Sequence, residues 1–135
     1  MSWTVLLDNE AVHALNDPAH REHRQVVGYA QIAARSKARA IAVSLAVPAA
    51  VRVEAGWDRT APAWAFINRL RIADLPLDAS QANAAAAIRN RTQVSVADAH
   101  LGAAIQSADQ VTVVTSDPPD MQLVAEGKHI EVVAL

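Results

Sequence analysis

Four acidic residues of this chain lie where they could act together on one ligand. Asp8 and Asp117 each follow an apolar run that predicts a strand, and Glu54 and Asp98 each share a predicted helical stripe with apolar residues. Carboxylates held together away from water repel one another, so ionised ones persist only with a cation between them, usually Mg²⁺ or Mn²⁺. The four acids therefore predict a buried carboxylate cluster and a metal-dependent reaction.

The case for Asp8 and Asp117 depends on where the strands end. In an open α/β sheet, ligands bind in the crevice beyond the carboxyl ends of the strands, which is where both acids are expected. Each has a structural alternative, because Asp8 could simply cap the next helix and Asp117 before Pro118 resembles a turn or cap. Asp120, three residues after Asp117, could cap the last helix or supply a further ligand.

The case for Glu54 and Asp98 depends on helical spacing. Apolar residues three and four positions from Glu54 place its carboxylate on a largely apolar stripe, where an unpaired charge is costly, although the side chain could rotate outward near the helix end. Asp98 shares a stripe with apolar residues too, but Ser95-Val96-Ala97-Asp98 also resembles a capping box. Both acids are expected to reach the same crevice as the strand-end acids.

The elements that must position these acids alternate between strands and helices. Aliphatic runs predict strands at 3–7, 40–45, 72–75, 111–115 and 130–133. Caps and apolar spacing predict helices at about 9–15, 17–38, 48–57, 60–70, 78–91, 95–107 and 118–127, the second opening at Asp17-Pro18 and the third at Pro48. Continuous aliphatic strands alternating with helices favour an α/β fold, with a mostly parallel sheet flanked by helices on both faces.

Composition limits the class of protein. The 135 residues, 52% of them hydrophobic, are enough for one domain without a disulfide or zinc, and the lack of cysteine excludes thiolate metal sites and thiol nucleophiles. The net charge of −2 excludes a uniformly basic nucleic-acid surface but leaves room for a local patch, in which Arg52 and Arg59 are candidates for binding substrate phosphate. With no basic leader and no apolar run of membrane-spanning length, we expect a soluble, cytoplasmic protein that does not enter a membrane.

Four short motifs occur in order along the chain. They are Leu6-Leu7-Asp8, Val47-Pro48-Ala49-Ala50-Val51-Arg52-Val53-Glu54, Val96-Ala97-Asp98-Ala99-His100-Leu101 and Val113-Val114-Thr115-Ser116-Asp117-Pro118-Pro119-Asp120. Together they resemble the PIN-domain family, in particular the VapC-type toxins of bacterial toxin–antitoxin systems. The resemblance spans essentially the whole chain and implies a single PIN-like domain, a three-layer sandwich, over residues 1–135.

The resemblance also implies a function. It indicates an endoribonuclease that depends on Mg²⁺ or Mn²⁺, forms a homodimer and is inhibited by a small VapB-type antitoxin that blocks the cleft. The implied acidic quartet consists of Asp8, Glu54, Asp98 and Asp117, with Thr115 as a supporting hydroxyl. Asp8 and Asp98 are the leading metal ligands, while Glu54 and Asp117 would complete the coordination, hold a second ion or orient the attacking water.

Two other functions are kept as alternatives. The residue after the first acid is usually small in the resembled family, whereas this chain has Asn9 followed by Glu10, which favours a catalytically weak or silent PIN domain that binds proteins. A receiver-like signalling domain would also use an acidic metal pocket, but it requires a lysine after a late strand. The chain has only Lys37 and Lys128, and neither follows a predicted strand.

Overall fold

The computed structural model describes residues 2–35 and 42–135, which form alternating strands and helices. The strands are β1 (Ser2–Leu7), β2 (Ala42–Pro48), β3 (Ala73–Leu75), β4 (Gln110–Thr115) and β5 (Glu131–Ala134). The helices are α1 (Asn9–Asn16), α2 (His23–Arg35), α3 (Ala49–Ala55), α4 (Ala65–Asn68), α5 (Ala79–Thr92), α6 (Val96–Ser107) and α7 (Pro118–Ala125). A 3₁₀ turn, η2 (Pro62–Trp64), precedes α4.

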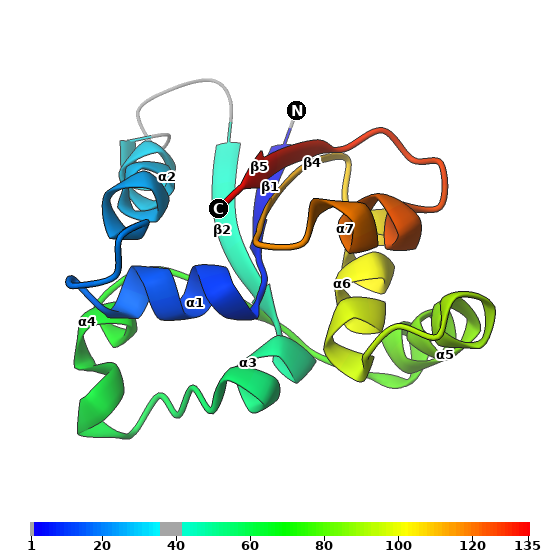
Figure 1. Ribbon diagram of the computed structural model, residues 1–135, viewed down its shortest axis with the longest axis horizontal. Coiled ribbons are helices and arrows are strands. Elements are labelled where there is room, and N and C mark those ends of the chain that lie inside the picture. The colour runs from blue at the N-terminus through cyan, green and yellow to red at the C-terminus, as the bar shows by residue number, and fades with distance from the viewer. Residues whose placement is uncertain (1, 36–41) are drawn as a thin grey trace.

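The strands form one sheet in the order β3-β2-β1-β4-β5, and every pairing between them is parallel. Helices α1, α2 and α4 lie on one side of this sheet and α5, α6 and α7 on the other, while α3 lies beyond the carboxyl ends of the strands (Figure 1). The expected α/β sandwich of three layers is confirmed. Because β1 lies between β2 and β4, its carboxyl end opens on the crevice where ligands bind in such sheets.

The core explains why the strands are continuous aliphatic runs. Successive residues Val5, Leu6 and Leu7 of β1 are all fully buried, because helices cover both faces of the sheet. Helix α6 is the most deeply buried helix, and its Gly102 permits close packing. A Cβ atom at Gly102 would lie 2.8 Å from Ile88 Cδ1 and 2.9 Å from Val124 Cβ, so α5 and α7 approach α6 more closely there than a side chain allows.

The predicted start of the second helix is wrong. Helix α2 begins at His23, and Asp17 instead follows the end of α1, where its Oδ1 accepts a hydrogen bond from the Ala19 N–H at 2.9 Å. Aspartate makes such local turns as readily as it caps helices, so Asp17-Pro18 was ambiguous. The predicted end of this helix near residue 38 and the predicted start of the next strand at residue 40 fall outside the described residues. Strand β2 continues to Pro48, beyond the predicted end at residue 45.

The segment after β2 is also less regular than predicted. Helix α3 ends at Ala55 rather than Trp57, because Gly56 adopts a left-handed conformation with φ of 74° and the Trp57 N–H bonds back to the Arg52 carbonyl. The single helix predicted at 60–70 is divided into η2 and α4. Caps with short-range partners were predicted correctly: the side chains of Asp78 and Ser95 accept backbone N–H groups at the starts of α5 and α6.

Within the described residues, none of the helices combines the length and the apolar character that crossing a membrane would require.

Candidate active site

Asp8 connects the end of β1 to the end of β4. Its Oδ1 accepts the Ala11 N–H at 2.8 Å and thereby caps α1, while its Oδ2 accepts the Ser116 N–H at 3.0 Å. The side chain is buried, with 6% exposure, and burial raises the pKa of this carboxyl despite these hydrogen bonds. Asp8 is therefore both a helix cap and a carboxylate held at the centre of the strand ends, so the two interpretations do not exclude each other.

Thr115 supports Asp8 from the neighbouring strand. This fully buried residue ends β4, and its hydroxyl hydrogen-bonds the Asp8 carboxylate while accepting the Asp117 N–H at 2.9 Å. One hydroxyl therefore fixes both the carboxylate of the first acid and the backbone of the fourth. Thr115 therefore lies beside Asp8, and its supporting role in the reaction stays a prediction.

Asp117 and Asp120 lie together at the start of α7. The Asp117 side chain caps this helix by accepting the Asp120 N–H at 3.3 Å, so its capping interpretation is realised. The pKa of Asp120 is raised, by desolvation first and then by the negative charge of Asp117. The Asp117 carboxylate is therefore close enough to disfavour the ionisation of Asp120.

Asp98 is the acid whose carboxyl is affected electrostatically by all the others. The Ser95 side chain accepts its backbone N–H at 3.1 Å, but no hydrogen bond to the Asp98 carboxylate is found in the described part of the chain. The pKa of Asp98 is raised to about 6, first by partial burial and then by four negative charges, in decreasing order those of Asp120, Glu54, Asp8 and Asp117. All the predicted acids therefore act electrostatically on this one carboxyl, as a shared site requires.

The predicted burial of all four acids is wrong for two of them. Asp8 is buried and Asp98 is partly buried, but Glu54 and Asp117 are exposed. Val51 and Ala55, four residues apart, occupy the buried face of the short helix α3, and Glu54 lies beside that face rather than on it. The acids therefore do not form one buried cluster, and two of them are open to solvent.

The donor set suits a hard cation, although no finished coordination shell is present. Among residues 2–35 and 42–135, no three acidic or histidine side chains are already arranged to hold a metal ion. The available ligands are nevertheless carboxylate oxygens, which are the donors that Mg²⁺ and Mn²⁺ prefer. The side-chain oxygen of Asn9, directly after Asp8, is also buried without a hydrogen-bond partner in the described residues. The residues present fit a divalent cation in the chemistry of their oxygen donors.

His100 contributes to the site in a way that the sequence patterns did not indicate. It is fully buried on α6, two residues after Asp98, and its Nδ1 accepts the Ala50 N–H at 3.3 Å. Ala50 lies in the first turn of α3, a helix whose N-cap, Pro48, offers no side-chain acceptor. His100 therefore joins the helix that carries Asp98 to the helix that carries Glu54. The signal available in the sequence was that His100 lies in a predicted helix whose residues are mostly apolar, which indicates burial.

Arg52 and Arg59 form an ion-pair cluster with Asp74. Arg59 donates to both carboxylate oxygens of Asp74, at 3.0 and 3.1 Å, and Arg52 donates to one at 3.1 Å. Arg59 also lies over the ring of Trp57, 4.5 Å from its centroid. Both guanidinium groups thus have partners within the chain, and a role in binding substrate phosphate stays a prediction.

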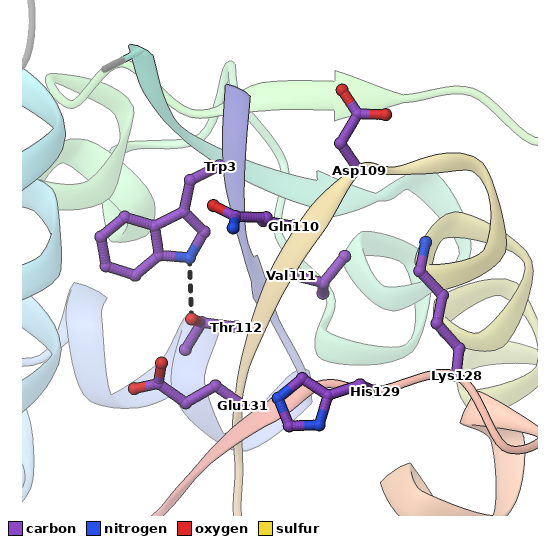
Figure 2. Close-up of a pocket in the computed structure, with 8 residues that line it drawn as sticks. All are labelled: Trp3, Asp109, Gln110, Val111, Thr112, Lys128, His129 and Glu131. Carbon is purple, nitrogen blue, oxygen red and sulfur yellow. Dashed lines mark hydrogen bonds between the residues drawn. The ribbon is translucent and has the colours of Figure 1, made fainter. Parts of the chain in front are cut away.

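A hollow of about 500 Å³ lies at the opposite edge of the sheet from the acids (Figure 2). It is lined by residues at the amino ends of β1, β4 and β5, among them Trp3, Thr112 and Glu131. The Trp3 indole N–H donates to the Thr112 hydroxyl at 2.8 Å across it. None of the predicted site residues contributes to this hollow.

Comparison with known proteins supports the fold. No family model matches the chain, and no curated protein matches its sequence. The solved structures that match include FitAcB from Neisseria gonorrhoeae, at 19% identity and a TM-score of 0.55 over 95% of both chains. They also include FitAB bound to the IR36 DNA fragment, at 19% identity and a TM-score of 0.55 over 96% of this chain and 94% of that one. The PIN-like α/β fold implied by the sequence motifs is confirmed.

Proposed function

We propose that this protein is a metal-dependent endoribonuclease that acts as the toxin of a toxin–antitoxin pair. The observation that carries the proposal is Asp98, a partly buried carboxyl without a hydrogen-bond partner in the described residues, whose pKa is raised to about 6 by burial and by the charges of four other acids. A structural role would have paired such a group. Carboxylates gathered near the carboxyl ends of parallel strands, one of them without a hydrogen-bond partner in the described residues, are what a cation-binding site needs.

The contacts of each acid indicate which role it would have in binding the cation or orienting the attacking water. Asp8 and Asp98 would hold the cation most directly, because Asp8 is fixed by Thr115 and Ser116 and the Asp98 carboxylate is free. Glu54 and Asp117, with Asp120, would complete the binding or orient the attacking water. When bound, Mg²⁺ or Mn²⁺ would make a water more acidic and stabilise negative charge on the phosphate. The chain's own contribution is to fix the Asp8 carboxylate through the Thr115 hydroxyl and the Ser116 N–H.

A protein partner over the site is part of the proposal. The four sequence motifs resemble VapC-type toxins, a resemblance that implies a small antitoxin, and the solved neighbours are named FitAcB and FitAB bound to the IR36 DNA fragment. In this chain Val53 lies on α3 next to Glu54, and Val96 lies on α6 two residues before Asp98. Their side chains are exposed, at 83% and 50%. Exposed apolar side chains beside a charged crevice favour a covering partner. We propose a VapB-type antitoxin there, and we also propose a homodimer.

The alternatives differ in what supports them. A silent PIN domain is favoured by the lack of a finished three-ligand arrangement in the described residues. The receiver-like domain loses support, because the ammonium group of Lys128 bonds the Ile105 and Ala108 carbonyls at the end of α6, away from the acids. Lys37 lies outside the described residues. A nuclease assay separates the first alternative from the proposal.

The test is cleavage of mixed single-stranded and structured RNAs by the purified protein. We expect cleavage with Mg²⁺ or Mn²⁺, none with a chelator, and a loss of at least about a hundredfold in Asp8→Asn and in Asp98→Asn, as for removal of a group that stabilises transition-state charge. Asp109→Asn is the matched control, since this exposed aspartate lies at the opposite edge of the sheet. Cleavage that survives chelation, or that persists in both site variants, would contradict the proposal.

A further inference from the structure

A groove of about 630 Å³ runs between α1 and the 3₁₀ turn η2, outside the acidic crevice. His13 and Asn16 line it from α1, and Ala63 and Trp64 from η2. Its volume is in the range of sites that hold small organic groups. The sequence patterns gave no role to these residues, and the acidic site does not use them.

Trp64 provides a supported aromatic surface in this groove. Its ring lies 5.5 Å from that of His13 at 47°, and it stacks at 6.3 Å on Trp57. Trp57 is buried and is itself fixed by the bond from its indole N–H to Asn68 at 2.7 Å. Trp64 is therefore held from two sides while remaining partly exposed.

The indole N–H of Trp64 distinguishes it from the other tryptophans. Those of Trp3 and Trp57 donate to Thr112 and Asn68, whereas that of Trp64 has no partner in the part of the chain that is described. An aromatic ring with a free donor in a groove is suited to a flat, polar ligand. A nucleobase has that shape and that chemistry.

The polar rim of the groove includes two carboxylates, those of Glu10 and Asp17. One oxygen of each has a partner within the chain, since His20 Nε2 lies 2.7 Å from Glu10 Oε1 and Asp17 Oδ1 accepts the Ala19 N–H. Because a carboxylate offers about four lone-pair sites, both can still accept N–H donors of a ligand. Two carboxylates repel a phosphate but attract N–H donors. Guanine presents two neighbouring donors, N1–H and N2–H, which match the two oxygens of a carboxylate, and no other common base offers this pair. The rim therefore favours guanine.

The groove adjoins a second hollow whose lining includes a hydrogen-bond partner of Asp8. A neighbouring hollow of about 520 Å³ shares Glu10 and His20 with it and also includes Ser116. Ser116 donates its backbone N–H to Asp8. A single strand with a phosphodiester at Asp8 could thus extend through the first hollow and place a base at Trp64. We propose that this groove, which we call the Trp64 groove, binds a guanine base of single-stranded RNA, an inference that rests on the proposed nuclease function.

The test begins with nucleotide binding without metal, which does not require catalysis. The full-length protein, in chelator, is titrated with guanosine monophosphate, inosine monophosphate and the other three ribonucleotides while the three indole N–H signals are followed by NMR. We expect guanosine monophosphate to shift the Trp64 signal and to bind about tenfold more tightly than inosine monophosphate, which lacks the N2 amino group. Equal shifts with every nucleotide, or shifts confined to Trp3, would overturn the proposal.

Variants then test the groove in RNA cleavage. We expect Trp64→Ala to weaken nucleotide binding about tenfold and Glu10→Gln to remove the preference for guanosine over inosine, with Trp3→Phe as the matched control that changes neither. Cleavage of guanosine-containing RNA that is unchanged in Trp64→Ala would overturn the groove while leaving the nuclease intact. Guanosine binding at Trp64 without any cleavage would support the groove and contradict the nuclease. Binding of an antitoxin peptide there in place of the nucleotide would also overturn the proposal.

Discussion

Asp8 and Ser116 are 108 positions apart in the sequence and are joined by a hydrogen bond of 3.0 Å from the Ser116 N–H to Asp8 Oδ2. This bond links the carboxyl ends of β1 and β4, neighbouring strands at the centre of the sheet. It explains how a residue that caps a helix also occupies the centre of the candidate site. The predictions below follow from the contacts around this pair.

Thr115→Val should slow RNA cleavage and lower stability. The substitution keeps the shape of the side chain but removes the hydroxyl that bonds Asp8 and accepts the Asp117 N–H. We expect a loss of about 1 kcal/mol in the free energy of unfolding and a cleavage rate reduced by about tenfold. Urea denaturation and initial rates measure the two effects. Thr115→Ser, which keeps the hydroxyl, should retain most of the activity, and the opposite order of the two variants would refute the role of the hydroxyl.

Asp98→Asn should stabilise the metal-free protein at high pH. Since the folded protein holds the pKa of Asp98 at about 6, above its usual 3.8, the folded state binds this proton more tightly and loses stability as pH rises from about 4 to about 6. The variant escapes that loss and should be more stable at about pH 8, by about 1 kcal/mol after allowance for solvent screening. Urea denaturation in chelator at about pH 4.5 and pH 8 measures this. If the free energy of unfolding changed with pH in the same way in the variant and the natural protein, the pKa of Asp98 would not be raised and the prediction would be wrong.

His100→Leu should destabilise the protein and alter its response to acid. The change leaves the Ala50 N–H without its acceptor, at a cost of about 1–3 kcal/mol. Burial lowers the pKa of His100, so the unfolded chain takes up the proton first, and stability is lost as pH falls below about 6.5. The variant should lack that part of the pH dependence, measured by thermal denaturation across pH. The exposed His129→Leu is the control, and an equal effect of the two substitutions would argue against the link between α6 and α3.

Gly102→Ala should be strongly destabilising, because its new methyl group would meet Ile88 and the Val124 backbone carbonyl at 2.8 and 3.0 Å. We expect a cost of about 1–3 kcal/mol in urea denaturation. Gly28→Ala is the matched control, since no described atom lies within 4 Å of a Cβ there and alanine favours helix by about 0.5–1 kcal/mol. If the two variants were equally stable, the close packing of α5, α6 and α7 would be wrong.

The features predicted from sequence are those with a local cause. The Ser95 cap and the aliphatic strands depend on residues a few positions apart, and the patterns located them. Asp17 has two local solutions of similar energy, and the pattern could not choose between them. Glu54 shows the limit of helical periodicity in a helix of seven residues, where a residue beside the buried face is easily assigned to it.

The parts of the site that could not be predicted depend on contacts between distant segments. His100 and Ala50 are 50 positions apart, and the groove between α1 and η2 exists only once Trp64 lies against His13. Likewise, Arg52 and Arg59 were predicted as candidates for binding substrate phosphate, and their pairing with Asp74 of β3 was not foreseen. No local pattern encodes such pairings, since they follow from the order of the strands.

Calorimetric titration with Mn²⁺ at about pH 6 tests most directly whether the acids form one cation site. We predict that the natural protein binds Mn²⁺ with release of a proton, because the pKa of Asp98 is about 6, and that the measured heat therefore depends on the ionisation enthalpy of the buffer. Asp98→Asn should lose the proton release and bind at least about tenfold more weakly. Equal Mn²⁺ affinity in the two proteins, with no proton released, would contradict the account.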